Sequence, residues 1–194
     1  MKQKVLFVDR DGVINKDSPA YIKSWSEFEF LPRSLEAIRR LTENGFDVIL
    51  ITNQSVVNRD FVSKKDLEAI HTRMKEVIKQ NGGEVKDIFY CPHRPEDQCD
   101  CRKPLPGLIL KAQETYQIDV AKTMMVGDSA KDIECAKNAG CGGSILVQTG
   151  NGITAEKILV EKGIFPSFIV KDLYEATSLL TNPDKKIYPE QTSS

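Results

Sequence analysis

The sequence predicts an α/β fold with a doubly wound parallel sheet, and three observations support this prediction. Six short apolar runs alternate with longer segments in which apolar residues recur every three or four positions. Glycines and helix-capping residues separate the two kinds of segment. The chain of 194 residues is long enough for one domain with a sizeable core. Alternating strands and helices favour a parallel sheet that is covered on both faces.

The predicted strands are short and apolar throughout, as expected of strands buried on both faces. In chain order they cover residues 5–8, 48–51, 88–90, 124–126, 145–147 and 168–170. Four helices are predicted between them, beginning near residues 33, 63, 106 and 129. Their start and stop signals are Gly45 after the first helix, Ser63 and Asp66 before the second, Pro106 in the third, and Ser129 and Gly140 around the fourth. We expect residues 1–181 to form a single domain and residues 182–194 to form a polar C-terminal tail.

Composition and charge argue against several functional classes. Hydrophobic residues make up 40%, charged residues 28%, and the formal net charge is -1. This balance gives no basic surface for nucleic acid. No apolar run approaches the ~20 residues of a membrane span, and the N-terminus lacks the apolar stretch and cleavage site of a signal peptide. We therefore expect a cytoplasmic monomer that binds neither nucleic acid nor membrane.

Three polar residues stand directly after predicted strands: Asp9, Thr52 and Asp128. Ligands of open α/β sheets bind outside the carboxyl ends of the strands. A single Asp after a strand is often only a turn or helix-cap residue. Three polar residues at strand ends of one sheet instead indicate a shared site with two carboxylates and a hydroxyl.

Four motifs surround these positions. In chain order they are Asp9-Arg10-Asp11-Gly12, Thr52-Asn53-Gln54, Arg102-Lys103-Pro104 and Gly127-Asp128-Ser129. Together they resemble the motifs of the haloacid dehalogenase (HAD) superfamily of phosphatases over about residues 4–150. The resemblance implies a Rossmann-like HAD fold. The segments between the motifs are too short for an inserted cap domain, so we expect an open site.

The resemblance also implies phosphoryl transfer through an aspartyl-phosphate. A phosphomonoester dianion repels a carboxylate nucleophile, so a cation must lie between them. Mg²⁺ takes hard oxygen ligands, and in the family these correspond to Asp9, Asp128 and the backbone carbonyl of Asp11. Asp9 would attack phosphorus. Asp11 would protonate the leaving oxygen and later deprotonate the attacking water, which favours a hydrolase.

Residues of the second and third motifs would bind the phosphoryl group. Thr52, the backbone N–H of Asn53 and Lys103 are expected to hold its oxygens, where transition-state charge accumulates. Asp132 could accept a hydrogen bond from Lys103 or from a metal-bound water, or it could only stabilise the start of its helix. The further candidates for substrate or phosphate binding are Gln54, Ser55 and Arg102.

A second constellation consists of Cys91, His93, Cys99 and Cys101. Three thiols and an imidazole so close in sequence suit a closed tetrahedral Zn²⁺ site. The odd total of five cysteines argues against a disulfide framework. A chance cluster of core cysteines would not suit this polar loop with two prolines, and a redox pair would show C-x-x-C spacing. We expect a structural zinc loop, residues 91–101, that fixes the adjoining Lys103.

The combination of D-x-D-G with the C-x-H and C-x-C pairs resembles two related families. Residues 21–32, 104–107 and 147–150 are similar to heptose bisphosphate phosphatases, which implies a sugar phosphate substrate and removal of the C7 phosphate of D-glycero-D-manno-heptose 1,7-bisphosphate. The short zinc-loop spacing and residues 127–133 are similar to histidinol-phosphate phosphatases. A phosphotransferase and a non-catalytic metal-binding module remain further alternatives.

Several further residues have open roles. Arg59, Arg102 and Lys23 are candidates to meet a second phosphate or sugar hydroxyls, although such residues are more often ordinary surface cations. Arg102 is the best of the three because the zinc loop would hold it in place. His71 stands mid-helix and is expected at the surface or on a helix face, without a ligand role. The remaining cysteines, Cys135 and Cys141, are predicted to be core residues.

Overall fold

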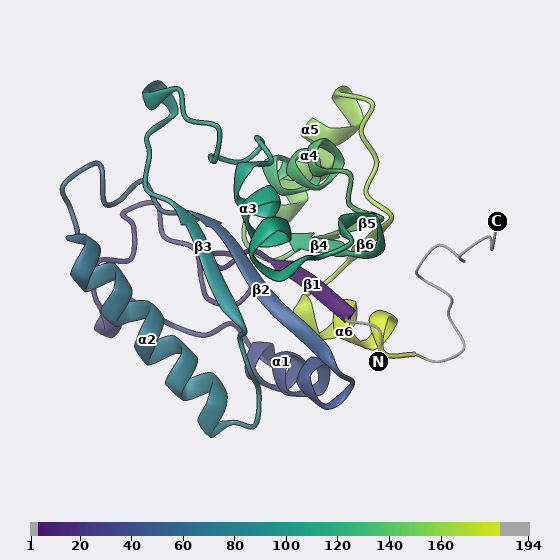
Figure 1. Ribbon diagram of the computed structural model, residues 1–194, viewed down its shortest axis with the longest axis horizontal. Coiled ribbons are helices and arrows are strands. Elements are labelled where there is room, and N and C mark those ends of the chain that lie inside the picture. Colours follow the sequence, from purple (N-terminus) through teal and green to yellow (C-terminus); the bar gives the residue numbers. More distant parts are fainter. Residues whose placement is uncertain (1–3, 183–194) are drawn as a thin grey trace.

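The computed structural model describes residues 4–182 and contains the predicted parallel sheet (Figure 1). Its order is β3-β2-β1-β4-β5-β6, and every neighbouring pair is parallel. The predicted tail from residue 183 onward lies outside the described residues. The strands are β1 (Lys4–Val8), β2 (Phe46–Asn53), β3 (Asp87–Cys91), β4 (Met124–Gly127), β5 (Gly143–Val147) and β6 (Phe168–Val170).

Six α-helices connect or follow the strands. The four predicted helices are confirmed, and Ser63 caps the second by accepting a hydrogen bond from the Asp66 backbone N–H. Two further helices, α5 and α6, were not predicted from the sequence. The bounds are α1 (Ser34–Glu43), α2 (Lys64–Gln80), α3 (Gly107–Tyr116), α4 (Ala130–Ala139), α5 (Gly152–Glu161) and α6 (Leu173–Leu180), with short 3-10 turns at η1 (Trp25–Glu27), η2 (Pro95–Asp97) and η3 (Val120–Lys122).

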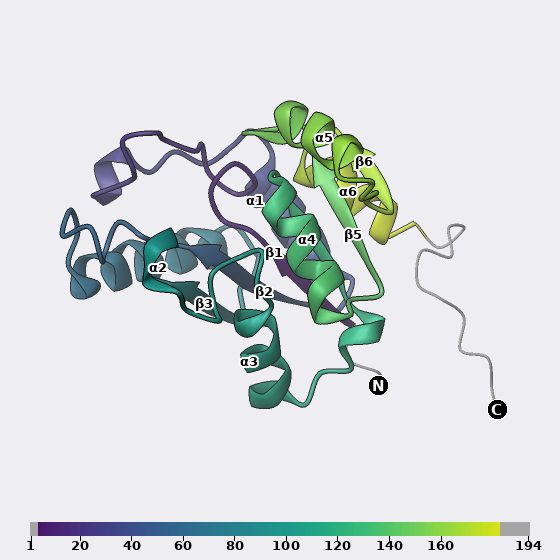
Figure 2. The same ribbon diagram turned by 90° about the horizontal axis from the view of Figure 1, so that it is seen from above.

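Helices cover both faces of the sheet because alternate strand residues point to opposite sides. In β1, Leu6 and Val8 join a core with α1, α2 and α6, whereas Val5 and Phe7 join a second core with α3 and α4. A smaller core packs α5 against α4 and β5. Figures 1 and 2 show these two helical layers on either side of the sheet. The doubly wound prediction is therefore confirmed.

The topology places a crevice between β1 and β4. The chain winds outward from β1 in both directions, so the strand order reverses at this pair. Such a switch point is where open α/β sheets bind ligands. Asp9 and Asp128 follow these two strands, and the Asp9 backbone N–H donates to the Val126 carbonyl at 2.9 Å.

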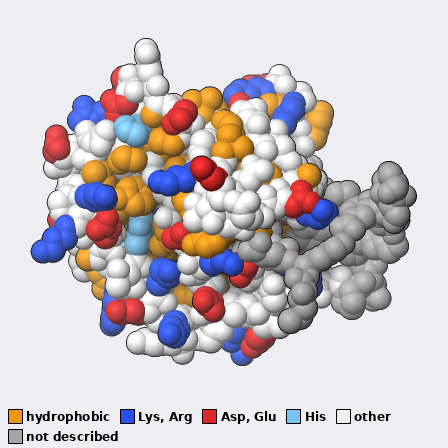
Figure 3. All heavy atoms as spheres, in the orientation of Figure 1, with side chains coloured by type: hydrophobic (Ala, Val, Ile, Leu, Met, Phe, Trp, Pro, Cys, Tyr) orange, Lys and Arg blue, Asp and Glu red, His pale blue; other side chains and the backbone are white. Residues whose placement is uncertain are grey.

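The connections around the crevice carry no inserted cap within residues 4–182. No helix in that range combines the length and apolar character needed to cross a bilayer. On the molecular face shown in Figure 3, acidic and basic side chains are interspersed with hydrophobic ones.

Candidate active site

Three buried carboxylates converge at the carboxyl ends of β1 and β4. Asp9, Asp128 and Asp132 each offer an oxygen, and these oxygens lie within 4.8 Å of one another. Asp132 is fully buried and Asp128 is only 2% exposed. Three carboxylates this close repel one another strongly in a poorly hydrated environment.

Lys103 supplies the positive charge that this cluster needs. Its Nζ lies 2.8 Å from Asp9 Oδ1 and 2.6 Å from Asp132 Oδ1, and it donates to the Ile51 carbonyl at 2.8 Å. Burial alone lowers the pKa of Lys103, but Asp132 and Asp9 outweigh it and raise that pKa above its ordinary value. One hydrogen bond and two ion pairs surround the ammonium group, so Lys103 is held as a cation in one position.

The pKa values of the acids show that one lysine is not enough. Burial raises the pKa of Asp9 well above its ordinary value; Lys103 lowers it, while Asp132 and Asp128 raise it further. Burial, and then the charge of Asp132, raise the pKa of Asp128 to about 7. The cluster therefore has the oxygen donors and the unbalanced negative charge that suit a hard divalent cation.

The backbone of two glycines approaches the Asp128 carboxylate closely and shapes the pocket around it. A Cβ at Gly12 would lie 2.2 Å from Asp128 Oδ2, and one at Gly150 would lie 2.1 Å from the same oxygen. Both glycines also have positive φ, which disfavours a side chain. The Asn151 backbone N–H donates to Asp128 Oδ2 at 2.8 Å. Asn151 was not predicted, and no motif in the sequence marks it.

Asp11 is held as a carboxylate by several donors. Burial raises its pKa, but Arg10 and the hydrogen bonds from Arg10, Asn15 and Gln54 outweigh burial and lower that pKa. Gln54 Nε2 donates to Asp11 Oδ2 at 2.7 Å and to Thr52 Oγ1 at 2.9 Å. Gln54, predicted to bind substrate, thus joins the acid of the first motif to the hydroxyl of the second.

Asp9, Asp11, Lys103 and Asp128 line one cavity of about 540 Å³. Its walls also include Ser55, Arg59 and Arg102, whereas Lys23 is not among the lining residues. The Lys23 ammonium instead binds backbone carbonyls of its own loop and Glu27. The N-cap and two further residues of α5, which the sequence did not predict to lie here, complete the wall: Asn151, Thr154 and Ile158.

Asp132 combines both of its predicted roles. One oxygen accepts from the backbone N–H and the hydroxyl of Ser129, which caps α4. The other oxygen binds Lys103. A Cβ at Gly127 would lie 2.2 Å from the Asp132 Cβ, so close packing against β4 fixes this side chain.

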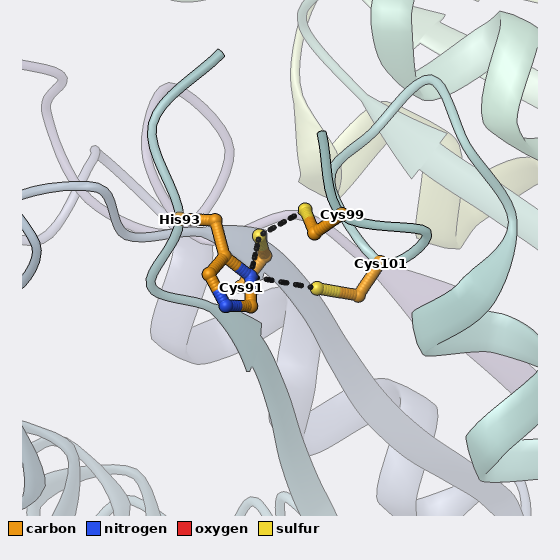
Figure 4. A group of neighbouring side chains, drawn as sticks. All are labelled: Cys91, His93, Cys99 and Cys101. Carbon is orange, nitrogen blue, oxygen red and sulfur yellow. Dashed lines mark hydrogen bonds between the residues drawn. The ribbon is translucent and has the colours of Figure 1, made fainter. Parts of the chain in front are cut away.

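The predicted zinc ligands converge in the loop after β3 (Figure 4). Cys91 Sγ lies 3.7 Å from Cys99 Sγ and 3.5 Å from His93 Nδ1, and His93 Nδ1 lies 3.3 Å from Cys101 Sγ. A tetrahedron with usual zinc bond lengths has S–S edges of about 3.8 Å and S–N edges of about 3.5 Å. The four donors therefore fit a closed zinc site.

The zinc loop is tied to the lysine that enters the carboxylate cluster. Arg102 stands in the chain between the zinc ligand Cys101 and Lys103. Its Nη1 donates to the backbone carbonyl of His93 at 3.0 Å. The Asn53 side chain makes two hydrogen bonds with the backbone of Lys103. Its Nδ2 donates to the Lys103 carbonyl at 3.2 Å, and its Oδ1 accepts from the Lys103 N–H at 3.1 Å. The second motif therefore holds the backbone of Lys103, and the residue before it is bonded to the zinc loop.

Of the two positions expected for His71, the surface one is wrong, and a face of α2 is correct. His71 is buried, and its Nε2 lies 3.1 Å from Arg10 Nη1. Its partner is 61 positions away in the chain, so helix periodicity could not reveal the contact. The core positions predicted for the other cysteines hold: Cys135 is fully buried and Cys141 packs against the same core.

Comparisons with known proteins agree with this geometry. A HAD-hydrolase-like family model matches residues 100–176. A D-glycero-beta-D-manno-heptose-1,7-bisphosphate 7-phosphatase of Pseudomonas aeruginosa is 46% identical over 79% of this chain and 85% of its own length. The enzyme of that name from Bordetella bronchiseptica is 47% identical over 83% and 88%.

A solved structure extends the match to three dimensions. The D,D-heptose 1,7-bisphosphate phosphatase of B. bronchiseptica, complexed with magnesium and phosphate, superposes with a TM-score of 0.85. It is 44% identical, and the match covers 92% of this chain and 98% of that one. The likeness holds over nearly the whole described chain. The comparisons therefore support the resemblance to heptose bisphosphate phosphatases over that to histidinol-phosphate phosphatases. The chain belongs to the heptose-1,7-bisphosphate 7-phosphatase family of HAD-like hydrolases.

Proposed function

We propose that residues 1–181 form a Mg²⁺-dependent phosphatase domain that hydrolyses a phosphomonoester through an aspartyl-phosphate at Asp9. The observation that carries this proposal is the meeting of Asp9, Asp128 and Lys103 at the switch point of the sheet. A nucleophilic carboxylate, a second carboxylate and a fixed cation are the groups that phosphoryl transfer from an ester requires.

The donor set at this point fits Mg²⁺. Asp9 and Asp128 would supply carboxylate oxygens, and the backbone carbonyl of Asp11 would supply a third ligand. Bound Mg²⁺ would offset the charge of these acids and of the phosphate. A solved relative holds magnesium and phosphate together, which supports the assignment.

The side chains then divide the chemistry. Asp9 attacks phosphorus, the ester P–O bond breaks, and Asp11 gives a proton to the leaving alcohol. Asp11 next removes a proton from the water that attacks the aspartyl-phosphate, so phosphate leaves and both acids return to their starting states. Asp11 is ionised in the free protein because Arg10 lowers its pKa. It must therefore gain its proton as the dianionic phosphate enters.

Polar groups at the end of β2 and on the next loop bind the phosphoryl oxygens. We assign this role to Thr52, the Asn53 backbone N–H, Ser55 and Lys103, all of which line the cavity. Such donors stabilise charge that develops in the transition state. Gln54 acts through Asp11 and Thr52, which it bridges.

The substrate proposed is a heptose 1,7-bisphosphate that loses its C7 phosphate, a step in the synthesis of activated heptose for surface glycans. The names of the relatives and the near-complete coverage support this choice. Arg59 and Arg102 line the same cavity, where the retained phosphate or sugar hydroxyls could meet them. Arg59 also lies 5.9 Å from the ring centroid of Tyr21, which positions the guanidinium.

A substrate panel tests this assignment. The enzyme is expected to release the C7 phosphate and leave the C1 phosphate, with kcat/KM at least ~10-fold above that for histidinol phosphate, or about 1.4 kcal/mol. Inorganic phosphate should appear without any added alcohol acceptor. Faster hydrolysis of histidinol phosphate would overturn the substrate, and phosphate transfer that requires an acceptor would overturn the reaction class.

Magnesium is expected to stabilise the protein more at high pH than at low pH. In the metal-free folded protein the pKa of Asp128 is about 7, whereas in the unfolded chain an aspartate has a pKa of about 4. Between these two pH values the folded state therefore binds a proton that the unfolded state has released. Stability of the metal-free protein should therefore fall as pH rises from 4 to 7. Mg²⁺ binds the ionised acids and should offset this loss. Thermal melts with EDTA or Mg²⁺ at pH 5 and 8 measure the effect, and a Mg²⁺ shift independent of pH would contradict it.

The zinc ligands are expected to support activity indirectly. Cys99→Ser should lower zinc content, melting temperature and kcat together, with kcat falling about 10-fold, because metal binding is coupled to folding of the loop before Lys103. Cys141→Ser, a half-buried cysteine outside the cluster, is the matched control and should retain its zinc. Metal analysis and kinetics on the same samples decide the question. Loss of zinc with full activity would show that the loop does not position Lys103.

The monomeric state and cytoplasmic location remain proposals. Three cysteine ligands must stay reduced, which suits a reducing compartment. Light scattering on the purified protein and cell fractionation test these two points.

A further inference from the structure

Arg10 is the residue between the two acids of the first motif, and its charge is almost completely buried. Its side chain is 2% exposed. Nη2 donates to both carboxylate oxygens of Asp11, at 2.8 and 2.9 Å, and Nε donates to Oδ1 at 3.1 Å. A planar guanidinium can make this forked contact, whereas a lysine ammonium cannot.

The opposite side of the guanidinium meets His71 from α2. Arg10 Nη1 lies 3.1 Å from His71 Nε2. Since a guanidinium can only donate, Nε2 must accept, and the imidazole is neutral with its proton on Nδ1. Burial, and then the charge of Arg10, lower the pKa of His71 to about 3, which agrees with a neutral ring. The Tyr90 ring packs edge-on against it at 5.7 Å between centroids.

We propose that His71 and Arg10 are positioning residues that hold the Asp11 carboxyl group at the leaving oxygen of the substrate. This inference rests on the proposed acid–base role of Asp11. The acceptor on His71 fixes one end of the guanidinium, and the fork at the other end fixes the plane of the carboxylate. Asn15 and Gln54 hold one carboxylate oxygen each, at 2.8 and 2.7 Å.

A structural role alone would have a different signature. If the buried pair only stabilised the packing of α2 on the sheet, its loss would lower melting temperature and slow all substrates alike. A misplaced general acid instead slows substrates with poor leaving groups most, because good leaving groups depart without a proton. The dependence on the leaving group therefore separates the two roles.

The experiment compares His71→Leu, His71→Gln and His71→Asn. The amide oxygen of Gln lies as many bonds from Cα as Nε2, whereas that of Asn lies one bond short. Ile70→Val, at a neighbouring buried position of α2, is the matched packing control. Kinetics use p-nitrophenyl phosphate and the sugar phosphate that the wild type hydrolyses fastest.

With His71→Leu and His71→Asn, kcat on the sugar phosphate is expected to fall about 10-fold and on p-nitrophenyl phosphate less than about 2-fold, with KM nearly unchanged. His71→Gln should keep most of the wild-type kcat on the sugar phosphate, and Ile70→Val should behave as wild type. An equal loss on both substrates, or a Gln variant as slow as Leu, would overturn the inference. A wild type that hydrolyses neither substrate would instead refute the proposed function.

Discussion

Replacing Asp9 with asparagine is expected to lower kcat by at least about 10³-fold, which corresponds to about 4 kcal/mol. An amide cannot form the acyl-phosphate, so the two-step route is closed. In the structure Asp9 Oδ1 accepts from the Arg10 backbone N–H at 2.7 Å and contacts Lys103 Nζ at 2.8 Å. An asparagine oxygen can keep both contacts, so the fold and the zinc content should survive.

Steady-state phosphate release measures the loss, and thermal melts with zinc analysis verify the fold. Mass spectrometry of the variant excludes deamidation back to aspartate. Acid quenching with radiolabelled substrate should recover label on the wild-type chain and none on Asp9→Asn. The matched control is Asp17→Asn, because Asp17 also lines the cavity but lies outside the carboxylate cluster. Retention of more than a few per cent of activity by Asp9→Asn would exclude Asp9 as the nucleophile.

The sequence predicted the sheet well because each strand is a distinct apolar run between turn signals. All six strands and the four helices with strong caps or glycine stops lie where expected. The helix at 173–180 was missed although Asp172 caps it by accepting from the Glu175 backbone N–H, a signal that is present in the sequence. The helix at 152–161 has weaker signals, since it begins with a glycine and Asn151 makes no side-chain cap.

The sequence predicted those parts of the candidate site whose residues form a recognisable local pattern in the chain. Acids after strands and four clustered zinc donors are local patterns. The contacts that orient these groups are not local, because they join positions far apart in the chain. Arg10 meets His71, and Asn151 meets Asp128, only after the sheet forms. A lone histidine in a helix carries no sign of such a partner, so its role follows from packing alone.

Lys103→Met is expected to reduce kcat at least about 10²-fold, because it removes the cation that lies 2.8 Å from the proposed nucleophile and that we propose to bind the phosphoryl group. Methionine preserves much of the buried stem. The change leaves Asp9 and Asp132 without their ion-pair partner in a site where Lys103 is 3% exposed. Removing one member of a buried ion pair typically costs about 3–5 kcal/mol, so a large fall in melting temperature should accompany the loss of activity.

The stability deficit of this variant should depend on pH in a defined direction. Without Lys103, burial and mutual repulsion raise the pKa of Asp9 further above its ordinary value, because the lowering effect of the Lys103 charge is lost. An acid with a raised folded pKa binds its proton more tightly in the folded state, so stability falls as pH rises. Melting temperatures of wild type and variant should therefore lie close together at pH 5 and far apart at pH 8.

A second substitution separates charge balance from catalysis. Lys103→Met combined with Asp132→Asn removes one buried carboxylate together with the cation, so much of the lost melting temperature should return at pH 8. Activity should stay low, because the double variant still has no ammonium beside Asp9 Oδ1, where it lies in the wild type. Recovery of activity along with stability would mean that Lys103 only balances charge in the fold. Recovery of neither would mean that Asp132 is needed for its cap on α4 more than for its contact with Lys103.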